Sequence, residues 1–214
     1  MNDNMKKEIQ SSAFERLLEH LKERKDVQNL DLMNLAGFCR NCLSKWYREE
    51  AEKKGITISD TRKEATDKSG AILAKKIKEK GHGLIHKEIV KDDKQVIKKI
   101  LLDWCSSKEI DVIITTGGTG LTGRDLTPEV LDEIKEKDIP GFGELFRLIS
   151  YKKIGTSTIQ SRAMAVLCKG TYIFALPGSS GAVTDAWDDI LKYQLDSRFE
   201  PCNFISLIPR LKEK

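Results

Sequence analysis

The pattern of apolar and polar positions changes part-way along the chain. Near the N-terminus four apolar residues repeat at i, i+3, i+4 and i+7: Phe14, Leu17, Leu18 and Leu21. This spacing predicts a helix over about residues 11–25, and a second helical period covers about 30–54. The two helices predict an N-terminal helical module over residues 1–55, which is too small to bury a large core of its own.

Beyond Gly55 short apolar runs alternate with helical stretches. The runs that predict strands are 56–60, 84–90, 111–115, 163–168 and 171–176. The stretches that predict helices are about 67–80, 92–104, 127–137, 145–149 and 181–195. This alternation predicts one α/β domain over residues 56–214, in which a mostly parallel sheet carries helices on both faces.

Composition adds that this is a globular chain with a mixed surface. Of 214 residues 33% are charged and 39% are apolar, and 37 basic against 33 acidic residues give a net charge of +4. The lysines are spread along the helices without interleaved aromatic residues, so we expect no nucleic acid partner. No apolar run approaches the ~20 residues of a membrane span. The polar N-terminus also lacks the apolar core of a secretory signal, so we expect a cytoplasmic protein with no membrane partner.

The stretch from Asp111 to Glu129 combines a strand, a glycine loop and a helix start: DVIITTGGTGLTGRDLTPE. The glycines of TTGGTG allow positive φ and the close approach of a ligand. Threonine hydroxyls and backbone N–H groups together suit an anion such as phosphate. The loop has neither the Walker pattern nor GxGxxG, and a tight turn without a ligand is the alternative. Thr127 is predicted as the N-cap of the next helix, with Pro128 at its first position.

Two aspartates are candidate metal ligands. Asp125 follows the glycine loop, and Asp92 follows the predicted strand 84–90. Carboxylates beside a phosphate site are typical ligands of Mg²⁺. If strands 84–90 and 111–115 are neighbours, the two acids line one crevice. The alternative for each is an ordinary helix cap.

Two further features offer contacts to an anion. The loop Pro177-Gly178-Ser179-Ser180-Gly181 follows strand 171–176 and presents hydroxyls and backbone donors, with a capped helix start as the alternative. Ser161-Arg162 places a permanent cation just before strand 163–168, with a surface arginine as the alternative.

The cysteines are few and odd in number, which favours reduced thiols. Cys39 and Cys42 form a CxxC pattern on the second predicted helix. Zinc would need two more ligands, and the sequence has no second CxxC. Buried structural cysteines are the first interpretation, and a redox pair or a metal shared between copies is the alternative.

Seven runs of the chain, taken in order, resemble one known family. They are TISDTR (57–62), DKSG (67–70), TTGGTGLTGRDLTPE (115–129), PGFGELFR (140–147), GTSTIQSRA (155–163), FALPGSS (174–180) and QLDSRFEPCNF (194–204). They resemble the MoaB/MogA family of molybdenum cofactor biosynthesis proteins, and GTSTIQSRA and PCNF are similar to its MoaB branch. The resemblance implies a three-layer α/β/α sandwich that assembles as a homotrimer or homohexamer. Only Ile56-Thr57-Ile58 stands where the family has a longer apolar first strand.

The resemblance also implies an activity and a set of site residues. Active members of the family are adenylyltransferases that bind molybdopterin and transfer the adenylyl group of Mg-ATP to its terminal phosphate, releasing pyrophosphate. Asp92 and Asp125 correspond to the acids that hold Mg²⁺ and serve as catalytic residues. The implied molybdopterin-binding residues are Thr115, Thr116, Gly117, Gly118, Thr119, Gly120, Ser161, Arg162, Pro177, Gly178 and Ser179. The implied nucleotide-binding residues are Ser59, Asp60, Ser69 and Gly70.

A second function stays open beside this one. A non-catalytic molybdopterin-binding or scaffold protein of the same pathway would carry the same loops without turnover. The N-terminal module does not share the family resemblance: residues 26–56 resemble a small bacterial helical family that carries the signature LAGFCRNCLSKWYR. An interaction or redox adaptor based on that module is a third function that the sequence leaves open.

Overall fold

A computed structural model of the chain describes residues 2–24, 26–27, 29–56, 67–211 and 213, with the side chains of Leu30 and Asn41 left out. The chain divides into two compact units, Met1–Ser59 and Asp60–Lys214.

The N-terminal unit consists of three helices: α1 (Asp3–Glu23), α2 (Asn29–Ala36) and α3 (Arg40–Lys53). α1 starts well before the predicted residue 11 because the Asn2 side chain caps it, accepting a 2.8 Å hydrogen bond from the amide of Met5. The predicted helix 30–54 is broken at Gly37, where φ is 72° and the Gly37 amide closes α2 on the carbonyl of Met33.

The C-terminal unit alternates helices with strands. Its helices are α4 (Lys68–Glu79), α5 (Lys94–Cys105), α6 (Thr127–Ile134), α7 (Pro140–Ile154), α8 (Ser180–Ala186) and α9 (Lys192–Gln194). Its strands are β1 (Val112–Thr116), β2 (Lys137–Asp138), β3 (Met164–Cys168) and β4 (Thr171–Leu176). Two 3-10 helices, η2 (Gly155–Gln160) and η4 (Ile205–Arg210), and one π-helix, η3 (Trp187–Leu191), are also described in this unit.

The described strands form a mixed sheet in the order β1-β4-β3-β2. β1 pairs with β4 in parallel, whereas β3 pairs antiparallel with both β4 and β2. β3 and β4 form a hairpin whose turn is Lys169-Gly170, both with positive φ (53° and 83°). The sheet of the described residues is therefore not mostly parallel as predicted, because adjacent strands joined by a two-residue turn must run antiparallel.

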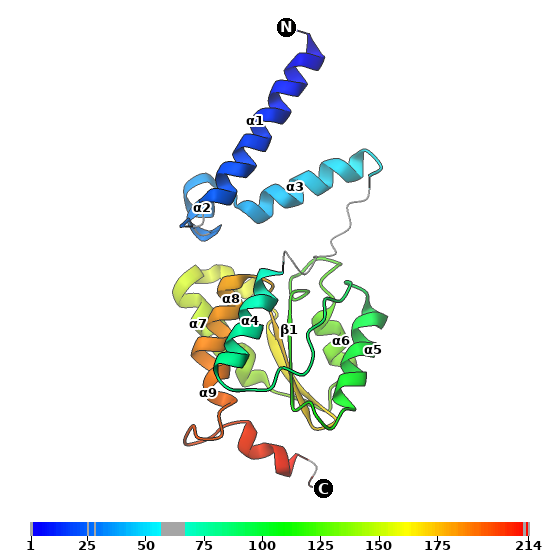
Figure 1. Cartoon of the computed structure of the whole chain (residues 1–214), viewed down its shortest axis with the longest axis vertical. Helices are drawn as coiled ribbons and strands as arrows, with labels where there is room; N and C mark the ends of the chain where they lie inside the picture. The colour runs from blue at the N-terminus through cyan, green and yellow to red at the C-terminus, as the bar shows by residue number, and fades with distance from the viewer. Residues whose placement is uncertain (1, 25, 28, 57–66, 212, 214) are drawn as a thin grey trace. The chain divides into compact units, whose positions relative to one another are not determined.

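Helices cover both faces of this sheet, so the unit is a three-layer α/β/α sandwich. α4, α7 and α8 lie on one face and α5 and α6 on the other (Figure 1). The side chains of β4 alternate between two cores: Tyr172, Phe174 and Leu176 pack on the first face. Ile173 and Ala175 pack on the second.

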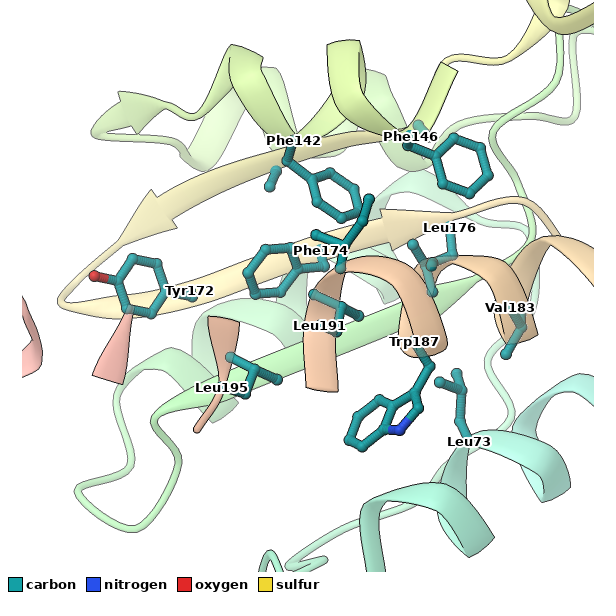
Figure 2. Packing of buried hydrophobic residues seen from close by; sticks show 14 of the residues in the cluster. Leu73, Phe142, Phe146, Tyr172, Phe174, Leu176, Val183, Trp187, Leu191 and Leu195 are labelled. Atoms are coloured by element: carbon teal, nitrogen blue, oxygen red, sulfur yellow. The ribbon is translucent and has the colours of Figure 1, made fainter. Parts of the chain in front are cut away.

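The larger core gathers aromatic and leucine side chains around Phe174. Phe174 lies on β4, and Figure 2 shows Phe142 and Phe146 of α7 above this strand and Trp187 and Leu191 below it. The ring of Phe142 meets that of Phe174 edge-on, with centroids 5.0 Å apart. This core fixes the carboxyl end of β4 next to that of β1, where the glycine loop begins.

Other predicted elements need correction. Residues 84–90 are described and are not a strand. The helix predicted over 127–137 ends at Ile134, and the short strand β2 follows it. The strand predicted over 56–60 lies outside the described residues except for Ile56. Within the described part of the chain, no helix has the length and apolar character needed to cross a membrane.

Candidate functional site

The TTGGTG loop leaves the carboxyl end of β1 beside the end of β4. The amide of Gly117 donates a 2.9 Å hydrogen bond to the carbonyl of Leu176, which extends the β1–β4 pairing by one residue. Gly117 and Gly118 then take φ values of 103° and 66°, which side-chain-bearing residues rarely adopt. The loop therefore has the positive-φ backbone that the sequence predicted.

Thr127 closes the loop rather than capping the next helix. The N-cap of α6 is Leu126, and Thr127 is already the first residue of the helix. Its hydroxyl donates to the carbonyl of Gly117 at 3.1 Å, and its amide donates to the carbonyl of Gly118 at 3.0 Å. A Cβ atom on Gly118 would lie 2.5 Å from the Thr127 Oγ1, so this position also needs glycine for space.

Asp125 is held at the end of the same loop by Thr122. Its Oδ2 accepts a 2.6 Å hydrogen bond from the Thr122 hydroxyl and a 2.9 Å bond from the Thr122 amide. Burial by itself would raise the pKa of Asp125, but the Thr122 hydroxyl, the amides of Thr122 and Gly120 and the charge of Arg162 outweigh it, and the pKa is lowered. The carboxylate is thus ionised and fixed in direction, which are the properties of a ligand for a hard cation.

Arg162 clamps this loop from the other side. Its Nε donates to the carbonyl of Gly120 at 2.7 Å and its Nη2 to the carbonyl of Asp125 at 2.8 Å. Its Nη1 forms an ion pair with Glu129, and this bond lowers the pKa of Glu129. In this structure the guanidinium therefore positions the Asp125 turn, while a direct contact of Arg162 with an anion stays a prediction.

Two other loops converge on the same edge. The Thr116 hydroxyl donates to the carbonyl of Pro177 at 3.3 Å, and the Ser69 hydroxyl donates to the carbonyl of Gly178 at 3.0 Å. These bonds join the glycine loop, the start of α4 and the loop after β4. Ser179 is the N-cap of α8, since its Oγ accepts a 3.1 Å bond from the amide of Ala182.

The N-terminus of α4 is capped by the side chain of Asp67. Asp67, which is buried, accepts a 2.9 Å hydrogen bond from the amide of Gly70 and pairs with Lys87 at 3.2 Å. A Cβ atom on Gly70 would lie 2.1 Å from the Asp67 Oδ2. Ser69 and Gly70, two of the implied nucleotide-binding residues, therefore lie where the glycine loop and the α8 cap meet. The other two, Ser59 and Asp60, are outside the described residues.

The remaining predicted residues are placed as follows. Asp93, rather than Asp92, caps α5, because its Oδ1 accepts from the amides of Gln95 and Val96, both at 2.9 Å. Asp92 is exposed on the segment that leads into this cap. Because residues 84–90 are not a strand, the condition for a crevice between neighbouring strands is not met, and a metal site shared by Asp92 and Asp125 stays a prediction. Ser161 precedes Arg162, and its carbonyl accepts a 3.5 Å bond from Arg147. Thr115 points its hydroxyl at the Phe174 carbonyl at 3.5 Å, and Thr119 is buried in the loop.

An open hollow of about 410 Å³ has Arg162 in its lining. Its lining residues are Asp138, Ile139, Pro140, Gly143, Glu144, Arg147, Arg162, Ala163, Met164 and Ala165. Arg147 also donates to the carbonyl of Ala163 at 3.2 Å, so it fixes the entry to β3. The described residues contain no group of three or more His, Cys, Asp or Glu side chains that could hold a metal. A cation at Asp125 would therefore take further ligands from phosphate oxygens and water.

Sequence reasoning did not single out three residues that shape the site. Thr122 orients Asp125, Glu129 pairs with Arg162, and Arg147 holds the strand entry that carries Arg162. Thr122 lies inside TTGGTGLTGRD three residues before Asp125, which is a spacing typical of a local side-chain turn. The sequence holds no comparable signal for the Arg162–Glu129 pair, because its members are far apart along the chain.

The family model MoCF_biosynth, described as a probable molybdopterin binding domain, matches residues 54–197. The chain belongs to this family. The match spans the glycine loop, Asp92, Asp125, Arg162 and the loop after β4, so the MoCF_biosynth family covers every residue of the candidate site.

Individual relatives point to the MoaB proteins within the MoCF_biosynth family. The molybdenum cofactor biosynthesis protein B of Escherichia coli (strain K12) is 44% identical over 149 residues, which are 70% of this chain and 88% of that protein. A crystal structure of a molybdenum cofactor biosynthesis protein B is 46% identical with a TM-score of 0.61, over 64% of this chain and 86% of that one. The tungsten cofactor synthesizing protein MoaB from Pyrococcus furiosus is 35% identical with a TM-score of 0.56, over 62% and 85% of the two chains. The predicted family and its α/β fold are confirmed.

The N-terminal segment is similar to a different family. The model of a protein of unknown function (DUF1244) matches residues 27–69, which contain α2, α3 and the CxxC pattern. The sequence resemblance of this segment to a separate helical family is thus confirmed as well.

Proposed function

We propose that this protein acts in molybdenum cofactor biosynthesis, where it binds molybdopterin and adenylylates its terminal phosphate with Mg-ATP, releasing pyrophosphate. The observation that carries the proposal is the Gly117–Asp125 turn. It joins a glycine loop with positive-φ backbone to an ionised, oriented carboxylate within one hydrogen-bonded unit. Membership of the MoCF_biosynth family and the names of its MoaB relatives supply the pathway.

The glycine loop is the proposed site for the phosphate of molybdopterin. Gly117 and Gly118 carry positive φ, and successive amides in such a turn form a concavity that suits an anion. Thr116 and Ser69 tie the loop after β4 and the start of α4 to this turn, so hydroxyls and helix starts surround it. Pro177, Gly178 and Ser179 would contact the pterin from that loop.

Asp125, together with Asp92, is the proposed holder of Mg²⁺. Its carboxylate fits the role because its pKa is lowered and Thr122 fixes its direction. The cation, when bound, neutralises phosphate charge and orients the nucleotide. Ser69 and Gly70, at the start of α4, are proposed to face the nucleotide with Ser59 and Asp60.

The reaction needs no side-chain nucleophile. An oxygen of the molybdopterin phosphate attacks the α-phosphorus of ATP, a new P–O–P bond forms, the α–β bond breaks and pyrophosphate leaves. The residues of the chain hold the two anions at reacting distance, and Arg162 keeps the Asp125 turn in place by its bonds to Gly120 and Asp125. Positioning and charge neutralisation are the main sources of rate enhancement in phosphoryl-type transfers.

The experiment compares wild type with Asp125→Asn in the presence of Mg-ATP and molybdopterin. We expect adenylylated product from wild type, a loss of turnover on the order of 10²-fold or more in the variant, and retained molybdopterin binding. Asp132→Asn is the matched control, since Asp132 is an exposed acid of α6 that pairs only with the surface Lys135 among the contacts described.

A non-catalytic binding role is the second candidate. It is favoured by the finding that residues 84–90 do not form a strand, so Asp92 does not lie at the carboxyl end of a strand beside β1. Tight molybdopterin binding by wild type, without product at any Mg-ATP concentration, would establish this role and remove the transferase proposal.

We further propose that the protein assembles as a homotrimer or homohexamer. Exposed apolar side chains collect along α7 and η2, including Leu148 at 58% and Ile159 at 84% exposure. Light scattering on the purified chain would measure the assembly mass, and a monomer at working concentration would contradict this proposal.

A further inference from the structure

Cys39 and Cys42 lie at the break between α2 and α3, in the unit that the proposed transferase does not use. Gly37 ends α2 with positive φ, and Cys39 becomes the N-cap of α3 in an extended conformation. Cys42 follows in the first turn of the helix, so both side chains lie on the same side of it. Their Sγ atoms are 3.7 Å apart.

At this separation the two thiols are in van der Waals contact. A disulfide requires about 2.05 Å between the sulfurs and Cβ atoms about 3.8 Å apart. Because Cys39 lies at the N-cap, outside the helical part of α3, the remaining gap can close by side-chain rotation together with a small backbone shift at Cys39. The backbone of α3 can therefore stay helical in both redox states.

The two sulfurs differ in access. Cys39 is buried at 6% exposure, and Leu21 and Leu43 of the same unit are buried as well, whereas Cys42 is partly exposed. The difference assigns separate tasks: Cys42 can be reached by an external sulfur, and Cys39 can reach only Cys42. An ordinary buried structural pair would have both thiols closed to solvent, as Cys105 and Cys168 are in the other unit. There, burial raises the pKa of the Cys105 thiol to about 12.

The helix start that carries the pair is fixed by Arg40, which follows Cys39 at the first position of α3. Its guanidinium donates to the carbonyls of Leu21, Arg24 and Val27 at 3.0, 2.6 and 3.0 Å. A fourth bond reaches the side-chain oxygen of Asn29 at 3.2 Å. These bonds tie the end of α1 and the following loop to the cysteine turn, so the geometry of the pair is held from outside the helix.

We propose that Cys39 and Cys42 are a dithiol–disulfide couple that exchanges with low-molecular-weight disulfides of the glutathione class. The Cys42 thiol loses its proton to solvent and its sulfur attacks one sulfur of the external disulfide. That S–S bond breaks, and one thiolate leaves and takes up a proton. Cys39 then loses its proton and attacks the Cys42 sulfur of the mixed disulfide, which forms the Cys39–Cys42 bond and releases the second thiol. The protein loses two electrons and two protons, and the external disulfide gains both.

The test exposes the full chain, reduced beforehand, to graded ratios of oxidised to reduced glutathione and analyses it by peptide mass spectrometry after acid quenching. We expect the peptide containing both cysteines to lose two hydrogens as one cooperative two-electron step. Exposed Cys202 is the internal control, since a single accessible thiol can form only a mixed disulfide with glutathione.

Two variants test the assigned tasks. In Cys39→Ser, Cys42 should stop at the mixed disulfide, because the second attack has no sulfur. In Cys42→Ser, Cys39 should stay a thiol at ratios that modify Cys202. Circular dichroism of both variants checks that α3 is retained, and the wild-type titration stands even where a variant does not fold.

Three outcomes would overturn the proposal. The first is wild-type protein in which Cys202 is modified while Cys39 and Cys42 remain thiols. The second is equal mixed-disulfide formation at Cys39 and Cys42 with no internal bond. The third is stoichiometric Zn²⁺ binding by the reduced pair that blocks disulfide formation at all ratios, which would make it a metal site shared between copies. Because the readout is sulfur chemistry in α3, its failure would not bear on the transferase activity.

Discussion

At the scale of single residues, the site depends on how Asp125 is held. Thr122 donates two hydrogen bonds to its carboxylate, and Arg162 donates to its carbonyl and to that of Gly120. The charge and direction of the carboxylate are thus set by its neighbours in the loop and by one arginine from the strand entry. Two substitutions in this loop test the position of the Asp125 carboxylate and its pKa separately.

Gly120→Ala should move Asp125 without altering any charge. The added Cβ would lie 2.6 Å from the Asp125 Oδ2, too close for any Cβ contact, so the carboxylate must shift. We expect turnover of Mg-ATP with molybdopterin to fall on the order of 100-fold. Gly123→Ala is the matched control three residues on, because its Cβ would meet nothing within 4 Å. Equal turnover in the two variants would show that the position of Asp125 is unimportant.

Thr122→Val should raise the pKa of Asp125, because it removes a hydroxyl that bonds to the charged form at 2.6 Å. The acid limb of the kcat/KM profile should therefore move to higher pH than in wild type. The lowered native pKa also means that Asp125 stabilises the fold above its unfolded pKa of about 3.9 and loses that contribution as the pH falls through the native value. On acidification the free energy of unfolding of Thr122→Val should therefore fall by less than that of wild type. Thr156→Val, at an exposed threonine, is the control, and an unshifted acid limb would contradict the assignment.

At the scale of elements, the sequence predicted those whose signal is local. The TTGGTG loop after β1, the strands over 163–168 and 171–176 and the helix that starts near residue 67 were predicted correctly from short-range patterns. The strand predicted over residues 84–90 was wrong, since an apolar extended run becomes a strand only when another strand accepts its hydrogen bonds. β2 has two exposed charged residues and carries no pattern at all.

The candidate site shows the same division. Its loops could be predicted because glycine and threonine clusters act through their own backbone. The choice of Asp93 over Asp92 as the cap of α5 depends on a one-residue difference in backbone position that propensities do not resolve. The Arg162–Glu129 pair could not be predicted from the sequence, because only the folded chain brings the residue before β3 next to α6.

Helix α7 offers a test of how closely elements pack at the strand entry. A Cβ on Gly143 would lie 2.6 Å from the carbonyl oxygen of Ala163, so Gly143→Ala should lower the free energy of unfolding by about 1–3 kcal/mol. Gly141→Ala in the same helix meets nothing within 4 Å and should leave the free energy unchanged or raise it by up to about 1 kcal/mol. Urea unfolding of the two variants measures the difference. A Gly143→Ala protein as stable as wild type would show that α7 and β3 are not in close contact.

At the scale of the whole molecule, the two units differ in how much they bury. In the described residues of the N-terminal unit, Leu21, Cys39 and Leu43 are the buried apolar side chains. The C-terminal unit has two cores that cover both faces of its sheet. A small core gives a low free energy of unfolding, so the units should differ in stability even within one chain.

Hydrogen exchange should reveal this difference directly. Amides of α1, α2 and α3 should exchange orders of magnitude faster than those of β3 and β4, because local unfolding of the helical unit exposes few apolar contacts. Mass spectrometry of exchanged peptides makes the measurement. Similar protection in the two units would contradict the separate-core description.

The central claim is that the Gly117–Asp125 turn supports transfer of an adenylyl group to molybdopterin. The most direct measurement follows a label from the α-phosphate of ATP in a single turnover with Mg²⁺ and molybdopterin. The account predicts label covalently attached to the pterin in wild type and in Gly123→Ala, and its loss in Asp125→Asn. Label that stays entirely in ATP, with molybdopterin bound to the wild-type protein, would contradict it.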